Sequence, residues 1–291
     1  MRTNVPSMVA GFLCHTGERD PEVLFQSFAH YLLTSSDAWT LPVPLEKIRR
    51  HHGFQCHGRA LLNRGMLLGQ NIFVNSDDPA TVQRFTEAHE MMESLCATLR
   101  SETPSRLPTH VERSFDRYKE RWCDSGAAAL LMPAALVYPE VSARGMSLTA
   151  GRYFAQRWQT SLTATMRRML DVDMEACIFA LLQEGHRKRE VIPSRVGQGV
   201  LWGEREHWDP PAQLRVMRWW RSPQTTSRLC HNESFLRDLS IYQTLADGVT
   251  GVVRVGRDRL DLEKIQGEYD TESLLIHIEA KATVMTLLHL A

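Results

Sequence analysis

The segment Arg84–Glu93 reads RFTEAHEMME and contains residues with the chemistry of a metal-dependent hydrolase. His89 and Glu93 are four residues apart, so on one helix they share a face. Imidazole nitrogen and carboxylate oxygen both bind zinc, and a neighbouring carboxylate such as Glu90 can act as a general base. A complete His-Glu-x-x-His motif has a second histidine where Glu93 stands here. Taken alone, the segment also fits a helix with Glu90 and Glu93 on its surface and a half-buried His89.

A second segment, Glu120–Pro133, reads ERWCDSGAAALLMP. The small residues 126–129 allow a helix to approach its neighbour closely, and Glu120 on that helix can supply a third ligand to a site on the facing helix. The alternative that the segment leaves open is an alanine-rich core helix with Glu120 exposed to solvent.

The elements that must position these side chains can be predicted from hydrophobic periodicity. Residues 76–79 are typical of the start of a helix, and they precede the apolar stripe of the helix that carries the first motif. Gly69 and Asn71 mark the turn of a hairpin. The spacing predicts helices over 22–33, 45–52, 80–99, 111–131, 148–170 (as two short helices joined near 159–161) and 173–184, and a hairpin over 65–75.

The residues after about 194 differ in pattern, with short apolar runs bounded by Gly, Pro or Asp. These runs predict strands at 216–220, 249–255 and 274–278, with a helix over 234–246 between them. The chain is therefore expected to be an α+β protein of three parts: a mainly helical domain with a small sheet over 1–140, a helical, helix-turn-helix-like region over 141–193, and a mixed α/β domain over 194–291.

Composition excludes several classes of protein. Lys plus Arg and Asp plus Glu are both 34, so no net charge supports binding to DNA by bulk electrostatics, and direct DNA binding is not expected. The longest nearly apolar run, 127–138, is interrupted by Pro133 and is too short for a membrane span. The six cysteines are dispersed and form no Cys-x-x-Cys pair, and no signal peptide is readable. This pattern indicates reduced thiols in the cytoplasm.

The two segments together, in this order, resemble the ImmA/IrrE (PprI-like) family of metallopeptidases. Arg84–Glu90 matches that family's Arg-Phe-Thr-x-Ala-His-Glu pattern, and Glu120–Pro133 matches its Glu-x-x-Ala/Cys-Asn/Asp-x-x-Ala-Ala-x-Leu-Leu-Met-Pro pattern. The resemblance covers roughly residues 22–182 and implies a minimal zincin-like domain. It is weaker over the last hundred residues, where long IrrE-type proteins carry a GAF-like sensor domain.

The resemblance implies a role for each matching residue. His89 and Glu120 are metal ligands, Glu90 activates the attacking water, and Glu93 stands where the family has its second ligand histidine. A site of one histidine and two glutamates neutralises a dication more completely than the usual set, so it polarises water less. More oxygen ligands also shift the preference from Zn²⁺ toward harder ions such as Mn²⁺.

The implied function is a regulatory zinc metalloprotease that cleaves a helix-turn-helix (XRE-type) repressor in a stress or mobile-element response. The tail would then sense a signal or shape access to the site. Because Glu93 departs from the motif, a second hypothesis is a non-cleaving regulatory protein that sequesters such a partner. A third is a metal-free partner module of a toxin–antitoxin pair.

Overall fold

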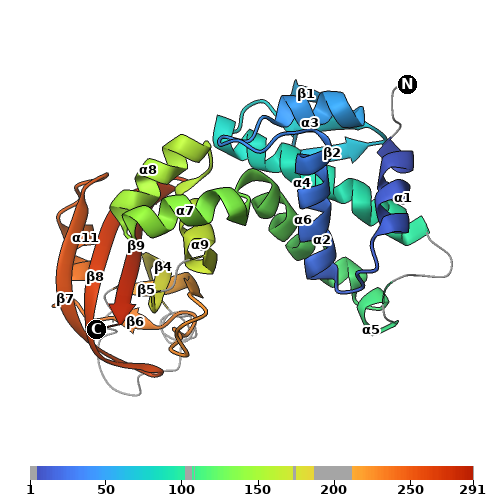
Figure 1. The fold of residues 1–291 in the computed structure, drawn as a ribbon. Coiled ribbons are helices and arrows are strands. Elements are labelled where there is room, and N and C mark those ends of the chain that lie inside the picture. Colours follow the sequence, from blue (N-terminus) through green and yellow to red (C-terminus); the bar gives the residue numbers. More distant parts are fainter. Residues whose placement is uncertain (1–4, 102–106, 108, 173–174, 187–211, 291) are drawn as a thin grey trace, which may run out of the picture. The chain divides into compact units, whose positions relative to one another are not determined.

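The computed structural model describes residues 5–101, 107, 109–172, 175–186 and 212–290. The chain divides into two compact units, Met1–Ala143 with Arg152–Arg168, and Arg144–Gly151 with Met169–Ala291. Figure 1 shows helices dominating the blue-to-green part of the chain and long strands dominating the orange-to-red part.

The first unit is mainly helical and includes one small sheet. Its helices are α1 (Val5–His15), α2 (Pro21–Ser35), α3 (Leu45–His52), α4 (Ala80–Ser101), α5 (Thr109–Glu112), α6 (Phe115–Leu131), α7 (Ala134–Arg144), α8 (Leu148–Trp158) and α9 (Leu162–Val172). The last three lie partly in the second unit. Asp20 caps α2 by accepting hydrogen bonds from the backbone N–H groups of Glu22 and Val23, and Gly53 ends α3 in the left-handed conformation.

Helices α2, α4 and α6 pack together and form the core of the first unit. Their apolar stripes are buried, including Phe25 on α2, Met92 on α4 and Ala127 on α6. At Gly126 an added Cβ would lie 2.6 Å from the Met92 sulfur and 3.3 Å from the Phe25 Cβ. The small-residue stretch of α6 therefore does bring this helix close to its neighbours, as the sequence predicts.

The small sheet has the strand order β1-β3-β2. Its strands are β1 (Gln55–Arg59), β2 (Gly65–Leu68) and β3 (Asn71–Asn75), with β1 parallel and β2 antiparallel to β3. The predicted hairpin is confirmed, with Gly69 in the left-handed conformation at its turn. Strands β2 and β3 both pack against α4, so the edge strand β2 lies beside the helix that carries His89 and Glu90.

The second unit is built on a six-stranded antiparallel sheet in the order β6-β5-β4-β9-β8-β7. The strands are β4 (Cys177–Gly185), β5 (Gln213–Arg221), β6 (Ser234–Phe235), β7 (Val253–Leu262), β8 (Ile265–Ile278) and β9 (Lys281–Leu290). Helix α11 (Ser240–Ala246) packs on β7, β8 and β9. The buried carboxylate of Asp258 accepts hydrogen bonds from the Ser240 N–H and hydroxyl, which fixes the start of α11.

Three of the expected helices differ from the structure. The helix expected over 173–184 is strand β4 from Cys177 onward. Six successive residues at the start of β4 are buried, so its sequence lacks the alternation by which a strand is recognised. The helix expected over 234–246 forms only from Ser240, after strand β6, and the helix expected over 111–131 is divided into α5 and α6.

The strand β4 falls within the segment expected to be helical yet pairs with β5 and β9. The sheet therefore takes residues from both sides of position 194. The α+β class is confirmed, with a small sheet in the helical part and a large one in the tail.

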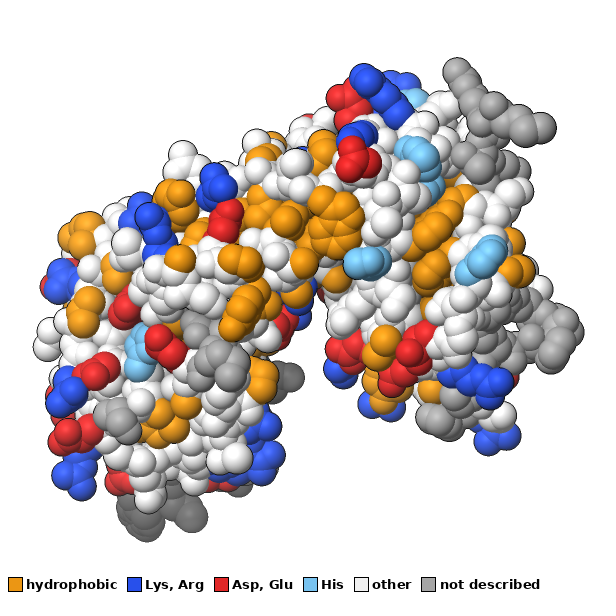
Figure 2. All heavy atoms as spheres, in the orientation of Figure 1, with side chains coloured by type: hydrophobic (Ala, Val, Ile, Leu, Met, Phe, Trp, Pro, Cys, Tyr) orange, Lys and Arg blue, Asp and Glu red, His pale blue; other side chains and the backbone are white. Residues whose placement is uncertain are grey.

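The described helices include no single one that is both long and apolar enough to cross a membrane. Helices α6 and α7 meet those criteria only as a pair, and they are bent by 69° at their junction. Figure 2 shows acidic and basic side chains interspersed on the visible face of each unit. On that face the balanced net charge is not separated into one acidic and one basic region.

Candidate metal centre

His89 projects from α4 toward α6 and contacts carboxylates through both ring nitrogens. Its Nδ1 lies 3.0 Å from Asp124 Oδ1 on α6. Its Nε2 lies 3.4 Å from Glu120 Oε2 and 3.9 Å from Glu93 Oε1. In the neutral ring, a proton on Nδ1 donated to Asp124 leaves the Nε2 lone pair facing Glu93 and Glu120. This is the arrangement that a metal-binding histidine requires.

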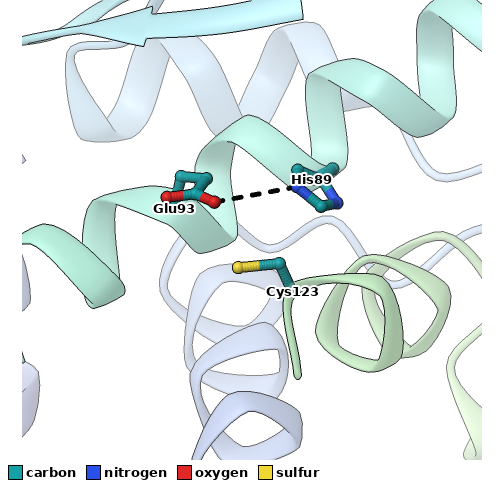
Figure 3. Close-up of side chains that lie close together, drawn as sticks. All are labelled: His89, Glu93 and Cys123. Carbon is teal, nitrogen blue, oxygen red and sulfur yellow. Dashed lines mark ion pairs between the residues drawn. The ribbon is translucent and has the colours of Figure 1, made fainter. Parts of the chain in front are cut away.

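Cys123, on α6, lies close to His89 and Glu93 of α4. One ligand atom each from His89, Glu93 and Cys123 lie within 4.8 Å of one another, and Figure 3 shows Cys123 facing the α4 residues from α6. Its thiol lies 3.5 Å from that of Cys96. The contact with Cys96 and burial raise the pKa of the Cys123 thiol well above its ordinary value, which disfavours the thiolate that a metal ligand must provide.

Lys119 brings a positive charge into the centre. Its ammonium lies 3.0 Å from Glu93 Oε1 and 3.2 Å from Glu120 Oε1. Because Glu93 is on α4 whereas Lys119 and Glu120 are on α6, the ammonium links the two helices that carry the candidate ligands.

Glu90 is the buried carboxylate of the site, with only 8% of its surface exposed. Burial raises its pKa from 4.5 to about 7. Glu93 and Glu120 add to this effect, against the opposing charges of His89 and Lys119. A carboxyl group with a pKa near neutrality can both accept and return a proton at physiological pH, as a general base in hydrolysis must.

A pocket of about 330 Å³ lies between strand β2 and the two motif helices. The residues that line it are Gly65, Met66, Leu67, His89, Glu90, Glu93, Ala97, Lys119 and Glu120. A Cβ at Gly65 would lie 2.3 Å from a Thr86 methyl group and 3.0 Å from a Glu90 carboxylate oxygen. Glycine at this position therefore allows β2 to approach Glu90 closely.

The raised pKa of Glu90 predicts a pH-dependent stability of the metal-free protein. The folded state holds this proton more tightly than the unfolded chain, so stability falls as pH rises from 4.5 to about 7 and stays lower above. Glu90→Gln removes the charge. We expect it to be about 2–3 kcal/mol more stable than wild type above pH 7 and nearly equal below pH 4.5. Denaturant unfolding in a chelating buffer at both pH values measures this, and an equal difference at the two pH values would contradict it.

The donors present fit a divalent metal ion. His89 offers an imidazole nitrogen backed by a carboxylate, and Glu93 and Glu120 offer oxygens directed toward the same nitrogen. One nitrogen with two carboxylates is a donor set that zinc and manganese both accept. The pKa of His89 lies above its ordinary value, because Asp124, Glu90 and Glu120 together outweigh the lowering effect of burial. Metal binding must therefore displace a proton at low pH.

Asp124 contacts Nδ1 of His89, whereas the other ring nitrogen faces Glu93 and Glu120. Replacement of Asp124 therefore tests whether it supports metal binding by His89. Asp124→Asn keeps the shape of the side chain but removes the negative charge that increases the basicity of the ring. We expect metal affinity to fall about tenfold or more with little change in stability. Competition titration against a chromogenic chelator measures the affinity. Glu112→Gln, which changes an exposed acid on α5, is the matched control, and an unchanged affinity in Asp124→Asn would contradict the role.

The structure brings all four sequence-predicted site residues, His89, Glu90, Glu93 and Glu120, to one pocket. Sequence reasoning missed the parts played by Lys119, Cys123 and Asp124. Asp124 had a readable signal, because it lies four residues after Glu120 and so shares its helix face. Lys119 had none, because its contact with Glu93 depends on how two helices pack.

Comparison with known proteins identifies the domain that carries these residues. A peptidase family model described as the IrrE N-terminal-like domain matches residues 28–170. A solved structure described as a Mycobacterium tuberculosis transcriptional regulator has the same fold, with a TM-score of 0.58 at 10% sequence identity. The match covers 99% of this chain and 82% of that one. The comparison with curated proteins gave no match. Residues 28–170 are therefore an IrrE N-terminal-like domain, in agreement with the resemblance of the two motifs to the ImmA/IrrE family.

Proposed function

We propose that this protein is a cytoplasmic regulatory metallopeptidase that cleaves a helix-turn-helix repressor of the XRE type in a stress or mobile-element response. The observation that carries the proposal is the position of Glu90. It is a buried carboxylate with a pKa of about 7, in a pocket where His89, Glu93 and Glu120 converge. A general base beside a set of metal ligands is the arrangement that peptide hydrolysis requires.

In this proposal His89, Glu93 and Glu120 hold the metal ion, Zn²⁺ or Mn²⁺. A bound divalent metal supplies Lewis-acid polarisation of the peptide carbonyl. Glu90 accepts a proton from the attacking water and returns it to the leaving amine nitrogen, for which its pKa near neutrality suits it. Asp124 keeps the His89 ring oriented throughout.

The edge strand β2 offers a way to bind an extended substrate. Within the described residues β2 pairs with β3 alone, and Gly65, Met66 and Leu67 line the pocket. A peptide that adds to such an edge is held by main-chain hydrogen bonds, which require no particular side chains. Its scissile bond would then lie next to Glu90.

The test is direct cleavage. The zinc- or manganese-loaded full chain is incubated with purified XRE-type repressors from the same organism, and the products are identified by mass spectrometry. We expect one repressor to be cut at a defined bond by wild type and not by Glu90→Gln. No cleavage of any repressor by the fully loaded wild type would contradict the proposal.

A second candidate function is a non-cleaving regulator that binds and sequesters the repressor. The contact between Lys119 and Glu93 favours it, because a ligand position occupied by an ammonium group is not free for a metal. The same incubation separates the two functions, because a stable complex that wild type forms without cleavage supports this candidate.

A further inference from the structure

The ammonium group of Lys119 contacts two of the proposed metal ligands, Glu93 and Glu120. The ammonium nitrogen lies 3.0 Å from a carboxylate oxygen of Glu93, which is on α4. It lies 3.2 Å from an oxygen of Glu120, which is on α6 together with Lys119. The Glu93 side chain is 20% exposed and that of Lys119 is 29% exposed. This is a half-buried pair, in which charges are screened less than at the surface.

Without a cation the two carboxylates would repel each other and the buried Glu90 beside them. Nε2 of His89 faces the same two groups, within 3.9 Å of both. An ammonium group and a divalent metal ion can each neutralise the charge of these carboxylates. The two cations cannot occupy the same position at the same time. Like charges a few ångströms apart in a half-buried site repel strongly.

We propose that Lys119 is an internal cation that competes with the metal ion for Glu93 and Glu120. This inference rests on the proposed metal site. The ammonium holds α4 and α6 together in the metal-free protein, and it must swing away before both carboxylates can bind metal. The lysine stem is long and flexible, and its partial exposure gives the ammonium a path to solvent. Lys119 thus lowers the metal affinity of the site and makes the metal-free state a stable one.

The proposal predicts two effects of opposite sign for Lys119→Met. In a chelating buffer the variant loses its cation, so its melting temperature should fall by a few degrees relative to wild type. In the presence of metal the competitor is gone, so calorimetric titration with Zn²⁺ or Mn²⁺ should show at least about tenfold tighter binding. A purely structural role for Lys119 would weaken both properties together.

Two further variants sharpen the experiment. Lys119→Gln keeps a hydrogen-bond donor without the charge, and it should also bind metal more tightly, even if Lys119→Met folds poorly. Lys264→Met changes an exposed lysine between β7 and β8 and should alter neither property. Equal, measurable metal affinity in wild type and both Lys119 variants would overturn the competition and leave the proposed function standing. No metal binding by any of these proteins would overturn both proposals.

Discussion

Replacement of Glu90 by glutamine is expected to lower kcat/KM for cleavage of the repressor about 1,000-fold, or about 4 kcal/mol of transition-state stabilisation. The amide has nearly the same shape as the carboxylate but cannot accept a proton from water. Glu90 is buried and lines the pocket under β2, and the other two carboxylates that line this pocket, Glu93 and Glu120, are the proposed metal ligands. Cleavage rates of the metal-loaded wild type and variant, measured on one repressor, give the ratio.

Metal binding separates this effect from damage to the site. Glu90 is not among the proposed ligands, so Glu90→Gln should bind metal within a few-fold of wild type. Glu87→Gln is a less suitable control, because Glu87 forms a half-buried ion pair with Arg49 at 2.7 Å and its replacement should destabilise the fold. Glu46→Gln on the exposed face of α3 is better matched. Cleavage by Glu90→Gln at a rate close to wild type would exclude Glu90 as the base.

Replacement of His89 by alanine is expected to weaken metal binding at least about 100-fold. His89 supplies the imidazole nitrogen of the proposed site. Its removal leaves two carboxylates and an ammonium group, and carboxylates without a nitrogen ligand do not favour zinc over harder ions. The loss also leaves Asp124 without its partner. Equilibrium dialysis against zinc measures the affinity.

The matched control is His15→Ala, which removes an exposed histidine at the end of α1. It should bind metal as wild type does. If His89→Ala retained wild-type affinity, the metal would have to bind through other groups, and the arrangement of His89, Glu93 and Glu120 would have no role in it.

The helices that carry the site could be predicted because their sequences obey simple periodicity. In α4 the buried residues Ala88, Met92 and Leu95 recur at helical spacing, and His89 and Glu93 follow from the same register on an adjacent face. The spacing also places Glu120 and Asp124 together on α6. The meeting of these helices at His89 was implied by the family resemblance and by the small residues of α6.

The central strands of the second unit could not be predicted in the same way. The strand β4 lies between β5 and β9, and its residues from Cys177 to Leu182 are buried irrespective of which face they occupy. A continuous apolar run of this length has no period, so it fits a buried helix as well as a strand. The correct assignment depends on pairing with β9, which is formed about a hundred residues later in the chain.

The set of site residues predicted from the sequence was incomplete for a related reason. Lys119 stands next to Glu120 in sequence, where it reads as an ordinary surface charge. Only the packing of α6 on α4 brings its ammonium to Glu93. The same packing brings Cys123 to Cys96 and beneath the candidate ligands. Contacts of this kind depend on the relative position of two helices, which no pattern within either helix specifies.

The most direct test of the central claim is the metal content of the protein at equilibrium with zinc or manganese, measured by elemental analysis beside Glu120→Ala and Glu93→His. If His89, Glu93 and Glu120 form a working site, wild type binds one metal ion per chain, Glu120→Ala loses it, and Glu93→His binds zinc more tightly still. If wild type remains without metal while Glu93→His binds one zinc ion, the claim is contradicted. The fold would then have kept the geometry of the site but lost a ligand, and the protein would act by binding alone.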